Sequence, residues 1–199
     1  MIDKDLQKHA REFKDYLDTH QYDVTDEGIF FPKACALASG EYFFDTNDGE
    51  RPGTAKNMLP MQGLNYLLEA GLRNGVQYTQ WHLAIFSGAY SPVASVSAAT
   101  FASAATEITS ASEGYTEATR RPWTSAAASG GVTDNVADRA AFTIASANEV
   151  VIRGAALLSD PVKGGTNGVL VSIARFANPR TESGGNIFNL GYRVRLRPE

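Results

Sequence analysis

The C-terminal part of the chain, from Gly184 to Arg197, alternates between apolar and polar residues with the period of a β-strand. One row of side chains is apolar: Phe188, Leu190, Tyr192, Val194 and Leu196. The other row is polar and mostly cationic: Asn189, Arg193, Arg195 and Arg197. A strand with two such rows belongs between a hydrophobic core and water or an acidic partner. The pattern predicts a surface that holds position rather than an active site.

Several shorter apolar segments upstream also predict strands. Tyr78 to Phe86 is largely uncharged on both alternating faces, which is typical of a strand buried on both sides. The other candidates are separated by Gly-, Pro- and Asn-containing segments: Ala141–Ile144, Val150–Leu158, Val169–Phe176 and Ile187–Leu196. Short strands at this spacing predict a mainly β fold, an antiparallel β-sandwich or jelly-roll-like domain or a barrel.

An N-terminal amphipathic helix is predicted over residues 2–18. Its apolar positions recur at helical spacing: Ile2, Leu6, Ala10, Phe13 and Leu17. Because an i,i+4 charge pair contributes only ~0.3 kcal/mol, a helix of this length is marginal alone and needs a surface to lie against. That surface is either its own domain or a neighbouring subunit, and the pattern leaves both open.

The segment from residue 19 to residue 57 has no regular period. Two aromatic runs, Ile29–Phe31 and Tyr42–Phe44, are each followed by turn-forming residues. Pro32 places the first run at a sheet edge or a bulge. Asn47–Gly49 and Arg51–Gly53 have the composition of turns. We therefore expect an extended arm or a small pair of strands here.

One further short helix is predicted from Met58 to Gly71, with Pro60 in its first turn. Its apolar face consists of Leu64, Leu67 and Leu68. This helix begins a β-rich domain over residues 58–199, preceded by the helical and extended arm over residues 1–57.

The segment from Ala89 to Gly131 consists mostly of Ala, Ser and Thr. Four larger apolar residues can anchor it to a core: Phe101, Ile108, Tyr115 and Trp123. A structureless loop of this length is uncommon inside a domain. We expect an ordered long loop with one helical turn between Phe101 and Glu107.

Composition favours a globular chain, since 43% of its residues are hydrophobic. The net charge of −4 is unevenly distributed. Residues 1–60 hold 7 Lys and Arg against 12 Asp and Glu, whereas residues 132–199 hold 8 against 6. This asymmetry permits head-to-tail contacts between copies, although a solvated acidic segment is the simpler explanation. It is too weak to favour nucleic acid as a partner.

The chain shows no sign of export or membrane insertion. Cys35 is its one cysteine, so an intrachain disulfide framework is excluded. The N-terminus is charged where a signal peptide would be apolar, and no run approaches the ~18 apolar residues of a membrane span. We expect a protein made in a cytoplasm and kept there or released by lysis.

Residues that could carry chemistry are scattered. His9, His20 and His82 occur singly and have no ligand spacing, so no metal site is expected. Residues 45–50 resemble a calcium loop but fit an ordinary turn better, because their glycine comes one position early. Residues 164–168 are rich in glycine, yet a strand follows them, which favours a hairpin turn over a phosphate loop. We expect no catalytic residues, no cofactor and no enzyme activity.

Several stretches of residues 60–199 resemble small structural proteins of tailed bacteriophages. The carrying stretches are residues 63–68, Trp81–Leu83, Gly114–Glu117, Arg121–Trp123, Ala141–Ile144, Gly154–Leu158 and Gly164–Gly168. The resemblance implies a virion component without enzymatic activity, made in the bacterial host cytoplasm. It also implies a closed homo-oligomer, commonly a trimer, that decorates the capsid or lies at the head–tail junction.

We predict that the arm and the C-terminal strand make the contacts of such an oligomer, with the major capsid protein or other virion proteins as further partners and no membrane. The predicted interface residues are Ile2, Leu6, Phe13, Leu17, Trp123, Arg193, Arg195 and Arg197. An alternative is a receptor- or carbohydrate-binding β-module that uses loop aromatics, namely Tyr90, Tyr115 and Trp123. A head–tail junction or tail protein is the other alternative.

Overall fold

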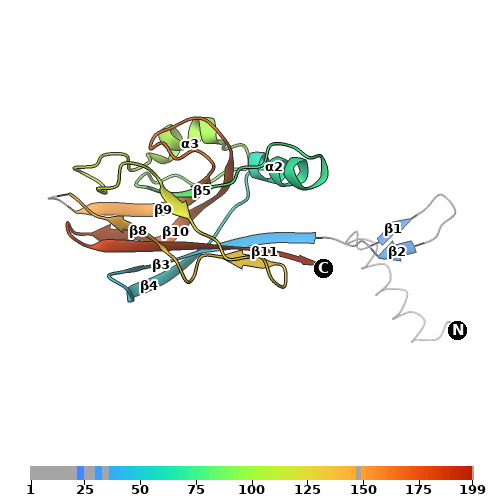
Figure 1. Cartoon of the computed structure of the whole chain (residues 1–199), viewed down its shortest axis with the longest axis horizontal. Coiled ribbons are helices and arrows are strands. Elements are labelled where there is room, and N and C mark those ends of the chain that lie inside the picture. The colour runs from blue at the N-terminus through green and yellow to red at the C-terminus, as the bar shows by residue number, and fades with distance from the viewer. Residues whose placement is uncertain (1–21, 25–29, 33–35, 147–148, 199) are drawn as a thin grey trace, which may run out of the picture. The chain divides into compact units, whose positions relative to one another are not determined.

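The computed structural model describes residues 22–24, 30–32, 36–146 and 149–198. Its contacts divide the chain into two units, Met1–Leu37 with Arg197–Glu199, and Ala38–Leu196 (Figure 1). In the first unit, β1 (Tyr22–Val24) and β2 (Phe30–Pro32) form an antiparallel pair. The predicted helix over residues 2–18 lies outside the described residues.

The Ala38–Leu196 unit is mainly β, as predicted, and its sheets are antiparallel. One sheet has the order β10-β9-β5-β6. Its strands are β5 (Trp81–Phe86), β6 (Arg121–Trp123), β9 (Val150–Leu158) and β10 (Leu170–Glu182). β9 and β10 pair antiparallel on either side of residues 159–169, so the hairpin connection predicted there is confirmed.

The second sheet has the order β4-β3-β11-β7, and β8 also pairs with β11. Its strands are β3 (Ala36–Thr46), β4 (Glu50–Lys56), β7 (Val132–Asp134), β8 (Ala140–Thr143) and β11 (Ile187–Pro198). Since β3 lies between β4 and β11, residues 38–57 belong to this sheet. The boundary between contact units therefore falls after Leu37 rather than after residue 57.

The β3–β4 hairpin confirms one predicted turn and corrects another. Asn47, Asp48 and Gly49 all have positive φ angles, as a tight hairpin turn requires. Arg51–Gly53, predicted as a turn, is instead part of β4, where Gly53 pairs with Phe44. A Cβ on Gly53 would lie 2.5 Å from the Phe44 ring, so this glycine makes room for an aromatic side chain.

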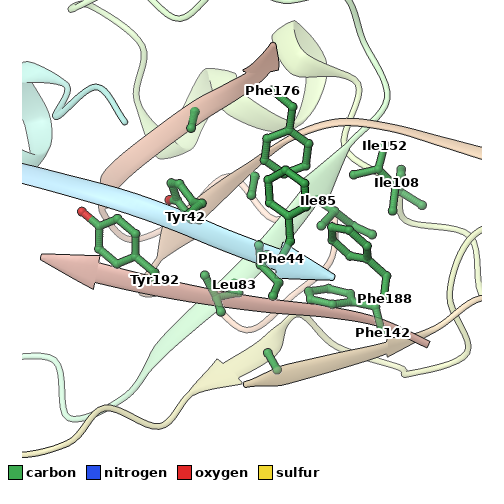
Figure 2. Close-up of a cluster of buried hydrophobic side chains, with 14 of the residues drawn as sticks. Tyr42, Phe44, Leu83, Ile85, Ile108, Phe142, Ile152, Phe176, Phe188 and Tyr192 are labelled. Atoms are coloured by element: carbon green, nitrogen blue, oxygen red, sulfur yellow. The ribbon is translucent and has the colours of Figure 1, made fainter. Parts of the chain in front are cut away.

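The inner faces of the two sheets share one aromatic core (Figure 2). Phe44 of β3 stacks on Phe176 of β10 with ring centroids 4.2 Å apart, which joins one sheet to the other. A second cluster lies on the other side of β5, where Ala84 and Phe86 pack away from Leu83 and Ile85. The strand is thus buried on both faces, as its sequence predicted.

Two helices of the described chain accompany the β10-β9-β5-β6 sheet (Figure 1). α3 (Ala98–Ala105) begins with a capping box between Ser97 and Thr100 and buries Phe101 in the second cluster. α2 (Met61–Leu72) packs against β10. The Ala-, Ser- and Thr-rich segment that contains α3 is ordered, because all four of its predicted anchors are buried.

Candidate protein–protein interface

α2 approaches the β10 strand through its smallest and most polar residues. A Cβ on Gly63 would lie 2.5 Å from the Val171 carbonyl oxygen, so only glycine permits this approach. The Gln62 side-chain oxygen accepts hydrogen bonds from the backbone N–H groups of Ala98 at 2.8 Å and Leu170 at 2.9 Å. Gln62 thereby ties α2 both to the start of α3 and to β10.

The opposite side of α2 is apolar and faces outward. Met61, Leu68 and Leu72 follow one another at intervals of seven and four residues, which places them on one face of the helix. They are 54%, 57% and 80% exposed, and Leu67 beside them is 38% exposed. We call these four residues the α2 outer face. The sequence correctly predicted the helix and two of these leucines as its apolar face, but that face is not buried in the described chain.

Next to the α2 outer face lies a groove of about 560 Å³. Leu59 and Leu64 line its apolar part, and Leu64 belongs to α2. The charged residues around it are Glu41, Lys56, Arg193 and Arg195. With three cations and one carboxylate, we call it the basic groove.

A buried hydrogen-bond network lies behind Asn57, which also lines the basic groove. The Asn57 side-chain amide donates to the Ser172 hydroxyl at 2.8 Å and to the Tyr192 hydroxyl at 3.0 Å. The Tyr42 hydroxyl donates to the same serine at 3.0 Å. Burial raises the pKa of Tyr192 to about 12, so its hydroxyl stays protonated well above neutral pH. The groove therefore has a fixed polar wall.

The predicted cationic row of β11 is divided between three environments. Arg193 donates from Nε to the Asp134 carboxylate at 2.8 Å, and that hydrogen bond lowers the pKa of Asp134. Arg193 and Arg195 both line the basic groove, Arg195 without such an acidic partner among the described residues, and Arg197 is exposed. Asn189, whose row was expected to face water or an acidic partner, is buried and donates to Asp45 and Asp48 of the same chain at 3.0 Å each.

Two other predictions from sequence concern the candidate calcium loop at residues 45–50 and the aromatic residues of the loops. Asp45 also pairs with Arg139, so the candidate calcium loop is a hairpin turn whose carboxylates contact protein groups. The binding-module alternative requires Tyr115 and Trp123 to be exposed loop aromatics, and neither is exposed; Trp123, which was also predicted as an interface residue, is only 8% exposed. Tyr115 is fully buried, and the Trp123 indole N–H donates to the Tyr192 carbonyl at 3.1 Å inside the core.

Sequence reasoning missed a buried ion pair after α3. Arg120 contacts both carboxylate oxygens of Glu107 at 2.7 Å, and both side chains are fully buried. The same guanidinium donates to the carbonyls of Asp160 and Gly165 at 3.0 Å. These contacts hold the β9–β10 connection against the segment after α3. No sequence signal distinguished Arg120 from its neighbour, because burial depends on the distant loop that covers it.

The remaining predicted interface residues, Ile2, Leu6, Phe13 and Leu17, lie outside the described residues. Within the described ranges, no group of three or more His, Cys, Asp and Glu side chains is placed to hold a metal ion. None of the described helices is long and apolar enough to cross a membrane. No protein-family model matches this chain, and a search of curated proteins finds none that is significantly similar.

Proposed function

We propose that this chain is a non-enzymatic structural protein of a tailed-phage virion. In this proposal a homo-oligomeric β-sandwich or jelly-roll domain decorates or cements the capsid, and the N-terminal arm reaches a neighbouring molecule. The α2 outer face carries the proposal, because four exposed leucine and methionine side chains on one helix provide apolar surface of the kind that protein partners cover. The basic groove beside it adds a polar rim of the kind that fixes orientation.

The shared aromatic core supports the sandwich part of the proposal. Side chains from both sheets meet face to face, as Phe44 and Phe176 do. Such a domain gains rigidity from its core and leaves its outer surfaces and loops free for neighbours.

The residues that resemble phage structural proteins build the domain itself. Gly154 is one example, since a Cβ there would lie 2.1 Å from the Phe86 ring. Trp123 and Tyr115 are core residues, and Gly168 closes the β9–β10 connection with a positive φ of 78°. The resemblance therefore bears on the scaffold, and in this proposal the outer surfaces of this chain determine its particular partners.

Quantitative mass spectrometry of purified virions tests this proposal. A copy number comparable to that of the major capsid protein is the expected result for a decorating or cementing protein. A number that matches one ring of subunits would favour the head–tail junction, which is the second candidate. Absence from virions would overturn the structural role and leave the binding-module alternative.

A further inference from the structure

The α2 outer face and the basic groove share the α2 helix, which contributes Leu64 to the groove. Leu64 belongs to α2 and lines the groove, while Leu67 and Leu68 follow it on the exposed side of the same helix. All of these residues belong to the Ala38–Leu196 unit. A ligand that covers the face and the groove needs an apolar stripe for α2 and acidic groups for the cations of the groove.

The N-terminal segment of the chain has this chemistry. Residues 2–18 carry apolar side chains at helical spacing, with Phe13 and Leu17 as the largest. At ~1.5 Å per residue, a helix over these residues would be roughly 25 Å long, compared with roughly 18 Å for α2. The segment is thus long enough to run along all of α2. Its polar positions hold five acidic residues, Asp3, Asp5, Glu12, Asp15 and Asp18, against four basic ones, Lys4, Lys8, Arg11 and Lys14, and residues 12–18 hold three of the five acids with one lysine.

We propose that the α2 outer face and the basic groove bind residues 2–18 of a second copy of this chain. The inference rests on the homo-oligomer of the proposed function and assigns its acceptor surface. Burial of apolar side chains from both helices supplies the binding free energy, and the groove cations fix the direction of the incoming segment.

The charge distribution along the chain favours a second copy as the source. Residues 1–37, which precede the unit that carries the groove, hold 8 Asp and Glu against 5 Lys and Arg, whereas two of the three groove cations come from β11 near the other end of the chain. A contact between the acidic end of one copy and the basic groove of the next is heterologous, and repetition around an axis closes it into a ring. Such a ring covers every α2 outer face.

Cysteine trapping tests the contact directly in the full-length protein. In a background with Cys35→Ser, we would mix one variant carrying Phe13→Cys with another carrying Leu68→Cys. The expected product under mild oxidation is a disulfide-linked dimer of the two variants. Val162→Cys is the matched control, because Val162 is 55% exposed and Leu68 is 57% exposed. Equal trapping at Val162, or no trapping at Leu68, would overturn the inference.

The same cysteines distinguish exchange between copies from folding back within one chain. A single variant with both Phe13→Cys and Leu68→Cys, oxidised at high dilution, is expected to give little internal disulfide. If that variant forms a monomeric internal disulfide while the mixture gives no dimer, the segment belongs to its own chain and the proposal is wrong.

Assembly measurements give an independent test. The double variant Leu68→Asp with Leu72→Asp, and a chain lacking residues 2–18, should each raise the concentration needed for assembly by roughly tenfold or more, as measured by light scattering after gel filtration. Val162→Asp should leave it unchanged. An unchanged assembly concentration for both α2-directed variants would contradict the inference. These tests use the isolated protein, so their failure is separate from absence of the chain from virions, which would sink the proposed function alone.

Discussion

α2 and α3 accompany the same sheet but use their apolar residues in opposite ways. α3 buries Phe101 together with Ala98 and Ala105, and so adds to the second hydrophobic cluster. α2 buries Gly63 and leaves Leu68 and Leu72 exposed. The difference teaches that an amphipathic pattern identifies a helix and its apolar face but not the molecule that the face contacts. α3 completes its own domain, whereas the α2 outer face stays exposed in the described chain, and we propose that a second copy covers it.

The largest expected effect comes from truncating the equivalent apolar residue in each helix. Phe101→Ala should destabilise the domain by about 3–5 kcal/mol, because it leaves a cavity in the cluster beneath α3. Leu68→Ala should change the free energy of unfolding by less than about 0.5 kcal/mol, because the side chain is mostly exposed. Urea unfolding of both variants at a concentration below assembly measures the contrast. Equal losses would mean that α2 is a core helix.

A second comparison removes the buried Arg120–Glu107 ion pair that follows α3. Arg120→Met leaves the Glu107 carboxylate buried without its cation and should cost about 3–5 kcal/mol. The double variant Arg120→Met with Glu107→Met should recover much of that loss, because no buried charge then remains unpaired. Thermal unfolding of the three proteins checks this order. A double variant no more stable than the single one would contradict it.

The close approach of α2 to β10 predicts a smaller effect with a control in the same helix. Gly63→Ala should destabilise by about 1–3 kcal/mol, since the added methyl group meets the Val171 backbone. Gly71→Ala should stabilise by about 0.5–1 kcal/mol, because nothing lies within 4 Å of its Cβ position and alanine favours the helix. Chemical denaturation should show changes of opposite sign in the free energy of unfolding of the two variants. Two changes of the same sign would show that α2 does not pack through Gly63.

The smallest effect concerns His82 in the sheet that carries both helices. Burial lowers the pKa of His82 from its usual 6.5, so the folded protein binds fewer protons there than the unfolded chain. The free energy of unfolding should therefore fall as the pH drops below about 6.5, and should level off once the pH is below the pKa of His82 in the folded protein. His82→Gln should make the unfolding free energy less dependent on pH in this range. An unchanged pH profile would exclude His82 as the source.

Much of the fold followed from local patterns. Alternation identified β11, β9 and the doubly buried β5, and turn residues identified the Asn47–Gly49 hairpin. Arg51–Gly53 was misassigned because its turn-like composition is overridden by pairing with β3, where Phe44 covers Gly53. Which residues of β3 pair with which residues of β4 cannot be deduced from the sequence of either strand alone.

The candidate interface was only partly predictable. The leucines of α2 and the arginines of β11 were visible as patterns, yet their meeting at one groove depends on the packing of α2 against β10. Trp123 was correctly expected to anchor its segment to a core, but it was also named as an interface residue, and the β5–β6 pairing carries it into the core beside Tyr192 instead.

The central claim is that the arm of one copy covers α2 and the basic groove of another, and lysine cross-linking of mixed isotopic copies tests it most directly. Equal amounts of unlabelled and nitrogen-15-labelled full-length protein would be mixed and cross-linked, and the peptides identified by mass spectrometry. The account predicts links between Lys8 or Lys14 and the exposed Lys56 of the groove, with one labelled and one unlabelled partner. The account is contradicted if every cross-link between the arm and Lys56 joins two peptides of the same isotope. It is also contradicted if the protein assembles but its arm is cross-linked only to lysines other than Lys56.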